Sequence, residues 1–246
     1  MIIPGIGGNP YRIKDRPAAP VFVGGYSEGF AGSASTRSIS LTGLTGGVDT
    51  APSHGDIVVV CYCVGGGAND GIDVTISTAG YTEVADLQQN ETFTTNLGVF
   101  WKFMGSTPDT TVVVGATGNT SRAGAVSIHV WRGIDPNFPL DVVSTTAGGG
   151  NTPVANPPSI TPITAEAVVL CCAGAAHGQG TATFSHGSLT EVTSAGGSDT
   201  DDATSVIGCN EAWSSGAYDA AAYTFSGAIV DNASWIAVTM ALRPGP

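Results

Sequence analysis

The chain has 246 residues, of which 35 are glycine, 14 are proline and only 11% are charged. Short Val, Thr and Ile runs separated by Gly, Ser, Asn and Asp predict an all-β protein with many turns. The formal net charge of −12 argues against nucleic acid or an anionic membrane as a partner, because both are polyanions. Residues 1–10 lack the cationic start and continuous apolar run of a secretory signal, so none is expected, and no apolar run approaches the roughly eighteen residues of a membrane span.

Residues 1–20 form the first predicted element, an extended N-terminal arm. Four prolines in this stretch disfavour helix. The arm is either disordered or laid across a neighbouring subunit, and its apolar content favours the neighbour. Its candidate docking residues are Ile2, Ile3, Ile6, Tyr11, Arg12, Lys14 and Arg16. Three of the eight cations lie in the arm against one acid, so a slightly basic arm precedes an acidic body.

Two β-sandwich modules are predicted to follow the arm, at residues 21–137 and 138–246. The strands expected in the first are Arg37–Leu41, Asp56–Val64, Asp73–Ser77, Tyr81–Asp86, Leu97–Met104, Thr110–Ala116 and Ala125–Trp131. Those expected in the second, after a proline-rich linker, are Val168–Cys172, Thr181–Ser185, Leu189–Thr193, Ser205–Trp213, Ala220–Ser226 and Ser234–Leu242. Short antiparallel strands in this number are typical of two sheets packed face to face.

The two modules are related by an internal repeat. Gly55–Cys63, GDIVVVCYC, returns 110 positions later as AEAVVLCC, and further segments recur at offsets of 108 and 111. A nearly constant offset is the mark of a duplicated unit of about 110 residues. The repeat pairs Val59 with Val169 and Arg132 with Arg243. It predicts two tandem antiparallel sandwiches, with one larger sandwich built from both halves as the alternative.

The order of these segments resembles a known family. The resemblance covers 38–244 and is carried by Gly55-Asp56 with its apolar strand and by the motifs GYTEV, VFWKF, TTVVV, SIHVWRGIDPNFPLD and AEAVVL. They are similar to a β-sandwich family of bacteriophages and prophages, whose members are mostly virion or tail-associated structural proteins of jelly-roll type. The resemblance implies a jelly-roll-like fold and a structural role. Its motifs are strand patterns, so it supplies no functional residue.

Reactive motifs are missing from the sequence. It has no Gly-x-Ser-x-Gly, Cys-x-x-Cys or His-Glu-x-x-His pattern and no phosphate-binding glycine loop. We therefore predict that the protein is not an enzyme and needs no cofactor. The five cysteines are an odd number, and four of them, Cys61, Cys63, Cys171 and Cys172, lie inside apolar runs. We expect free, buried thiols rather than a disulfide framework.

Three features leave alternatives open. His177 and His186 flank a predicted hairpin, but a two-histidine site lacks the further ligands of zinc, so no metal is expected. The acidic loops 69–73 and 199–202 offer oxygens suited to calcium, although a solvated loop is the favoured interpretation. An exposed tryptophan could stack on a sugar ring, whereas a buried one would belong to the core, and the core is favoured.

The sequence therefore predicts a non-enzymatic structural protein of a bacteriophage particle, assembled in the host cytoplasm and located on the virion. It would decorate or cement the capsid, or belong to the tail, and dock through its N-terminal arm. Its expected partners are other virion proteins and further copies of itself. The alternative function is a module at the tail tip that binds a host surface glycan or receptor.

Overall fold

The computed structural model describes residues 18–32, 36–68, 70–117, 122–150, 152, 154–177, 183–198, 202–211, 213–226 and 233–246. These residues form sixteen β-strands, and no helix occurs among them. The described part of the chain accordingly holds no helix with the length and apolar character of a membrane span. The all-β prediction is confirmed, and every strand pairing in the described ladders is antiparallel.

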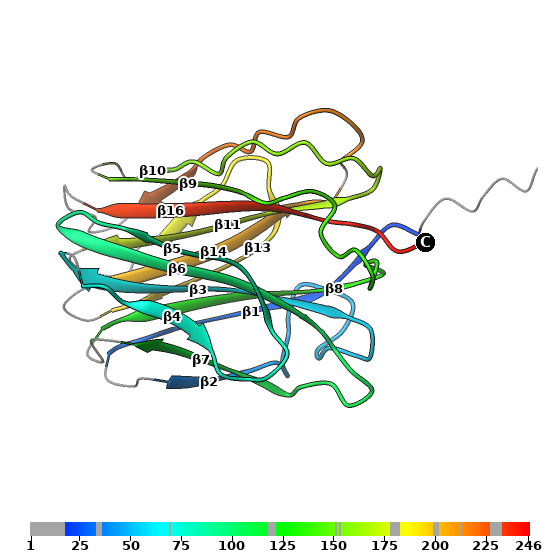
Figure 1. The fold of residues 1–246 in the computed structure, drawn as a ribbon, viewed down its shortest axis with the longest axis horizontal. Helices are drawn as coiled ribbons and strands as arrows, with labels where there is room; N and C mark the ends of the chain where they lie inside the picture. Colours follow the sequence, from blue (N-terminus) through cyan, green and yellow to red (C-terminus); the bar gives the residue numbers. More distant parts are fainter. Residues whose placement is uncertain are drawn as a thin grey trace, which may run out of the picture.

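Strands β1 to β8 build one five-stranded and one three-stranded sheet (Figure 1). The larger sheet has the order β1-β8-β3-β6-β5 and the smaller sheet the order β2-β7-β4. Their bounds are β1 (Val21–Phe30), β2 (Thr36–Ser40), β3 (Ile57–Gly67), β4 (Asp73–Ile76), β5 (Thr82–Gln89), β6 (Phe93–Phe103), β7 (Thr111–Thr117) and β8 (Gly124–Arg132).

Strands β9 to β16 build a second pair of sheets. The five-stranded sheet has the order β13-β14-β11-β16-β9 and the three-stranded sheet the order β10-β15-β12. Their bounds are β9 (Thr145–Gly150), β10 (Val154–Ala155), β11 (Val168–His177), β12 (Thr183–Ser185), β13 (Thr190–Gly197), β14 (Asp202–Asn210), β15 (Tyr223–Ser226) and β16 (Ser234–Leu242). When eight is added to each strand number of the first half, both strand orders of the second half result, the five-stranded one read in reverse.

The ladder registers correct the alignment of the two halves by one residue. Ile57 pairs with Trp131 and Val168 pairs with Leu242, so both strands of this ladder are displaced by 111 positions. Arg132 and Arg243 therefore correspond, as predicted, but the counterpart of Val59 is Leu170 and not Val169. A shift of one residue matters because successive side chains in a strand point to opposite faces.

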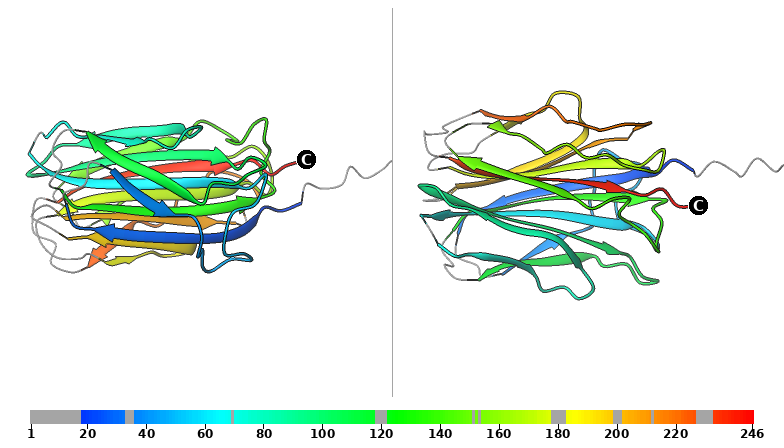
Figure 2. Two further views of the ribbon diagram at one scale, coloured as in Figure 1. Left: turned by 90° about the horizontal axis from the view of Figure 1, so that it is seen from below. Right: turned by 45° about the horizontal axis from the view of Figure 1, so that its top comes forward.

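The four sheets are stacked as four layers, with the two five-stranded sheets facing each other in the middle (Figures 1 and 2). β3 lies against β11 and β14, while the edge strands β1 and β13 lie together. A central core fills the space between the large sheets and includes Val59, Cys61, Leu170 and Cys172. The halves thus share a core instead of following one another as separate beads.

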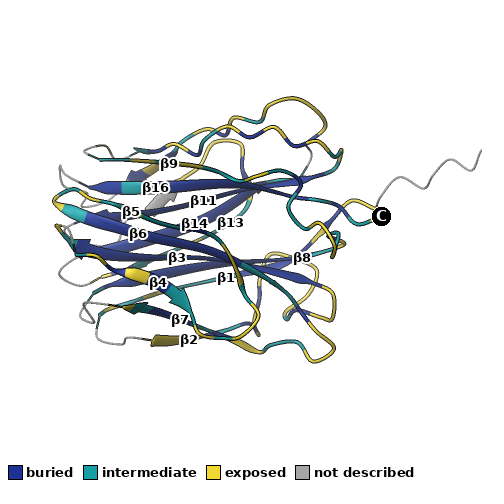
Figure 3. Cartoon of the chain, in the orientation of Figure 1, coloured by how far each residue is buried: buried dark blue, intermediate teal, exposed yellow. Residues whose placement is uncertain are grey.

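Two outer cores fill the spaces between each large sheet and its three-stranded partner. The first contains Val58, Val60 and Val112, and the second contains Val169 and Cys171. β3 and β11 are consequently buried on both faces, which Figure 3 shows as dark strands at the centre of the molecule. Burial on both faces explains why their sequences are unbroken apolar runs and not alternating patterns.

Three strands were not predicted from the sequence, β1, β9 and β10, and the first two are rich in glycine. In β1 the reason is a close approach between the halves, because a side chain at Gly29 would overlap the backbone of Gly196 in β13. Gly197 in turn faces the backbone of Gly124. Glycine at these positions lets the edges of the two large sheets meet backbone to backbone.

Candidate functional site

The arm residues predicted to dock, Ile2, Ile3, Ile6, Tyr11, Arg12, Lys14 and Arg16, lie outside the described residues. The described chain starts at Ala18 and enters β1 at Val21, at the same end of the molecule as the C-terminus (Figure 1). Pro20 lies beside Gly133, and Ile134 forms a bridge with Pro244. The root of the arm and the C-terminus therefore share one end of the body.

A groove of about 420 Å³ opens at the root of the arm. Its apolar wall is formed by 20–22 and 46–48, in which Val48 is 66% exposed. The opposite wall carries Glu191 and Glu211 from the second half. Partial burial and the nearby negative charge of Glu211 raise the pKa of Glu191. Neither glutamate forms an ion pair with a described residue, so the groove is an uncompensated acidic surface.

Two arginine–aspartate pairs brace this end of the body at corresponding positions. In the first half, Arg132 Nε and Nη2 donate to the two carboxylate oxygens of Asp56 at 2.8 and 2.9 Å. Asp56 is fully buried and also accepts a hydrogen bond from the Ser53 amide at 2.8 Å. Bidentate pairing, together with the donated amide, fixes the buried carboxylate in one orientation.

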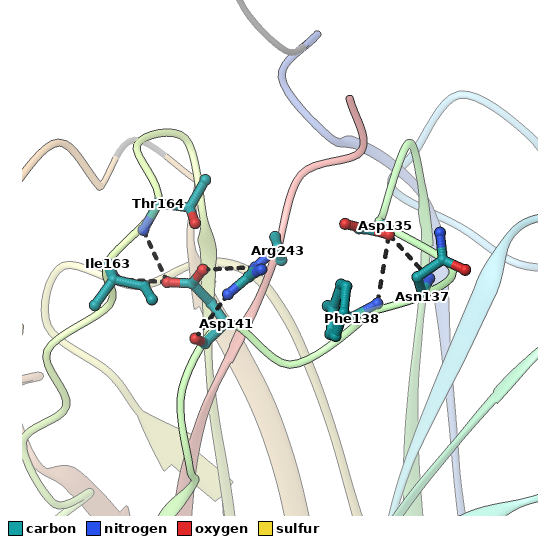
Figure 4. Close-up of polar contacts among 7 residues, drawn as sticks. All are labelled: Asp135, Asn137, Phe138, Asp141, Ile163, Thr164 and Arg243. Carbon is teal, nitrogen blue, oxygen red and sulfur yellow. Dashed lines mark hydrogen bonds and ion pairs between the residues drawn. The ribbon is translucent and has the colours of Figure 1, made fainter.

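The second half builds the same brace with an aspartate from the linker (Figure 4). Arg243 Nε donates to Asp141 Oδ1 at 3.1 Å, and Asp141 Oδ2 accepts from the amides of Ile163 and Thr164 at 2.5 and 3.0 Å. Burial alone would raise the pKa of Asp141, but the hydrogen bonds from Thr164, Ile163 and Arg243 outweigh it and lower that pKa. The residue corresponding to Asp56 by the 111-residue displacement is Ala167, so Asp141 replaces it.

The linker between the halves is held by further contacts at this brace. Asp135 Oδ1 accepts hydrogen bonds from the amides of Asn137 and Phe138 at 2.9 and 3.4 Å (Figure 4). The Arg243 guanidinium lies 5.6 Å from the centre of the Phe138 ring. These contacts hold the first part of the predicted linker, residues 135–141, which we call the strap, against the end of the second half.

A second acidic cleft lies at the open edge of β4. It measures about 270 Å³ and is lined by 73–76 of β4, by Tyr81 and Glu83, and by Phe100 of β6. β4 is the last strand of its sheet, because only β7 pairs with it among the described strands. The smaller sheet has three strands and the large sheet against which it packs has five, and β4 lies against β6 and β3.

Carboxylates gather at this cleft. Asp73 lies on β4, while Glu83 and Asp86 lie on β5, opposite Phe100 and Gly98 of β6. Burial, a hydrogen bond with Asp73 and the negative charges of Asp73 and Glu83 raise the pKa of Asp86 to about 7. Near neutral pH, Asp86 therefore exchanges a proton in a cleft that has an excess of negative charge.

A histidine, a threonine and an aspartate lie together in the interior of the second half. His177 Nε2 lies 2.9 Å from Thr204 Oγ1, and its Nδ1 lies 4.0 Å from Asp202 Oδ2. These residue types occur in hydrolase triads, but all three side chains are buried, so a substrate could not reach them. The five cysteines are free and buried, as predicted, and burial raises the pKa of Cys63 and of Cys209 to about 12. Such thiols are inert.

The histidine pair and the two acidic loops were the candidate metal sites of the sequence. His177 is buried whereas His186 is exposed, and no cluster of three or more metal-ligating side chains occurs among the described residues. Asp70 of the first acidic loop pairs with Arg122 at 2.6 Å, which neutralises it. Positions 199–201 of the second loop lie outside the described residues.

All four tryptophans belong to the described part of the chain. Trp131 and Trp213 are buried, while Trp101 and Trp235 are half-buried and pack against the cores, so the core interpretation is confirmed.

Comparison with known proteins gives no relative: no protein-family model, no curated protein and no solved structure matches this chain.

The acidic cleft could not be found from the sequence. Asp73 and Asp86 are thirteen positions apart on strands of different sheets, and no spacing rule links them. One signal in the sequence pointed to the cleft, namely two acidic residues on β5. Glu83 and Asp86 lie on either side of a β-bulge. The bulge changes the alternation and so hides their common face.

Proposed function

We propose that this protein is a non-enzymatic structural component of a bacteriophage particle, attached through its N-terminal arm. It would act as a capsid decoration or cement protein or as a tail-associated protein, with other virion proteins and further copies of itself as partners. Its proposed location is the virion, after assembly in the host cytoplasm. The β-sandwich motifs that resemble phage structural proteins support this assignment.

One observation carries the proposal. The described residues of the three hydrophobic cores all lie between Phe22 and Leu242 in the sequence. The cores of the body are therefore built from residues that follow the arm. Ala18, where the described chain begins, is exposed. An extended, partly apolar and basic segment rooted on a rigid acidic body is suited to docking on a neighbour.

We infer that the body arose by duplication of one eight-stranded module. The identical strand orders, the equivalent braces at Arg132 and Arg243 and the 111-residue displacement of the central ladders support this inference. The face-to-face packing is that of a two-fold dimer whose subunits are joined by the strap. Fusion of two such subunits would fix one copy of each half on the particle.

Deletion of residues 1–20 tests the docking role. The truncated protein should melt at the temperature of the full chain, because the described members of the three cores begin at Phe22, but it should fail to load onto particles that lack the native protein. A matched control replaces residues 2–16 with a Gly/Ser segment of equal length, which should fail in the same way. Normal loading of either variant would place attachment on the sandwich surfaces and contradict the proposal.

The acidic cleft favours one alternative function, glycan binding at a tail tip. Carboxylates accept hydrogen bonds from sugar hydroxyls, and the half-exposed Tyr81 ring supplies an apolar wall. Against it, two of the four tryptophans are buried and the other two are half-buried and pack against the cores. A glycan array should therefore show no ligand. A hit that is lost in an E83Q/D86N variant would favour this alternative.

A further inference from the structure

We propose that the basic segment Tyr11–Arg16 of a second copy of this chain binds in the acidic cleft at the open edge of β4. The two copies exchange arms across a two-fold axis, and each arm adds to the three-stranded sheet of its partner. This inference rests on the proposed docking role of the arm and names the surface that receives it.

The first argument is the unpaired edge of β4. Its residues pair with β7 on one side only, and all four of them line the cleft on the other. An extended peptide can continue such a sheet because the free backbone groups accept one more ladder. The added strand would lie over β5, the edge strand of the large sheet next to β6.

The second argument is charge complementarity between the cleft and the arm. Asp73 of β4 and Glu83 of β5 line the cleft, and Asp86 of β5 lies behind them, hydrogen-bonded to Asp73. None of the three forms an ion pair with a described cation, since the arginine and lysine pairs of the described chain involve other acids. An added strand must therefore bring positive charge toward β5.

The sequence of the arm has that pattern. Between Pro10 and Pro17, cations occupy every second position as Arg12, Lys14 and Arg16. Side chains two positions apart in a strand lie on the same face, so all three cations would face the carboxylates together. Their aliphatic stems would cover the aromatic wall formed by Tyr81 and Phe100.

Geometry favours a second copy over the chain's own arm. β1 and β5 are the opposite edges of the large sheet, four strand spacings or about 19 Å apart. Through successive ladder pairs Glu83 is level with Tyr26, which is about 17 Å further along β1 than Val21. The direct separation is thus about 25 Å, whereas the five residues from Arg16 to Val21 span at most about 18 Å, so the chain's own arm could not bring all three cations to Glu83. The smaller sheet also covers the direct route.

The second half provides a matched control. The pairs that β5 forms with β6 recur 108 positions later as the pairs that β13 forms with β14. Glu191 therefore corresponds to Glu83, and Ser194 corresponds to Asp86. At the equivalent place in the second half, serine therefore stands where the first half has the Asp86 carboxylate. Glu191 instead lines the groove at the root of the arm with Glu211, which is the other acidic surface that a basic segment could select.

Sedimentation velocity of four full-length proteins tests the exchange. The wild type should self-associate, with a dissociation constant that rises at least tenfold between 50 and 500 mM NaCl. An arm variant, R12E/K14E/R16E, and a cleft variant, E83K/D86K, should each be monomeric at the same concentrations. The control E191K/E211K should associate like the wild type.

Mixing the two monomeric variants is the decisive measurement. Each reversed arm then meets a reversed cleft and each native arm a native cleft, so the mixture should form dimers of wild-type stability. Restored dimers also prove that both variants are folded. The inference is overturned by a wild type that stays monomeric, by failure of the mixture to associate, or by dimers that E191K/E211K abolishes. If the arm deletion still prevents particle loading in those cases, the proposed function stands while the exchange fails.

Discussion

Substitution of His129 by methionine should remove an acid-sensitive element from the central core. His129 lies on β8, is fully buried against Phe22 at a ring distance of 5.0 Å, and has no hydrogen-bond partner for either ring nitrogen among the described residues. Burial lowers the pKa of His129 to about 3, although backbone groups of Glu191 and Ile207 oppose this in part. The imidazole is therefore neutral in the folded protein.

The sign of the pH dependence follows from this shift. The unfolded chain binds a proton at His129 below a pH of about 6.5, whereas the folded chain does not until about pH 3. The contribution of neutral His129 to the unfolding free energy is complete above pH 6.5 and is lost as the pH falls toward 3. With about 1.4 kcal/mol per pH unit, acidification from pH 7 to pH 5 should cost about 2 kcal/mol of unfolding free energy through this residue.

Methionine is the matched replacement because Met240, at the corresponding position of the second half, is buried in the same central core. Urea unfolding of the wild type and H129M at pH 7 and pH 5 measures the effect. The difference between the two proteins should shift by about 2 kcal/mol in favour of H129M at pH 5. An exposed control, H54Q, should follow the wild type. Parallel pH profiles of the wild type and H129M would refute the reasoning.

Three further outcomes are expected. D86N should stabilise the protein at pH 8 but not at pH 4, because the raised pKa of Asp86 makes its ionisation unfavourable in the folded state; urea titrations with equal stability gains at both pH values would contradict this. G174A should lower the unfolding free energy by about 1–3 kcal/mol, since its methyl group would lie 2.7 Å from Cys63 Sγ, while G105A, in open space, should be neutral. A reducing agent should leave the melting temperature unchanged because all five thiols are free, whereas a fall of several degrees would reveal a disulfide.

Local patterns of the sequence predict the strands of the cores well. The apolar runs at β3 and β11 are central strands, and Cys61 and Cys63 face the central core while Cys171 and Cys172 face opposite sides. These predictions succeed because alternation and apolar content are read residue by residue. The repeat likewise predicts the correspondence of Arg132 and Arg243.

The sequence could not show how the halves are arranged. β1 and β9 are selected by tertiary contacts, because Gly29 of β1 faces the backbone of Gly196 and Gly150 of β9 faces the Glu91 side chain, although local strand propensity is low. The acidic cleft arises because a three-stranded sheet covers a five-stranded one, a consequence of tertiary packing. The partner of Arg243 is Asp141 in the strap, which no repeat alignment would select.

Cryo-EM of phage particles purified from cells that make this chain tests the central claim most directly. The account predicts that the four-layered body recurs on the particle surface, with density for residues 1–17 continuing from Ala18 along a neighbouring subunit. Particles that lack the body would contradict the account. So would a body attached through its sheet faces while the root of its arm at Ala18 points to solvent.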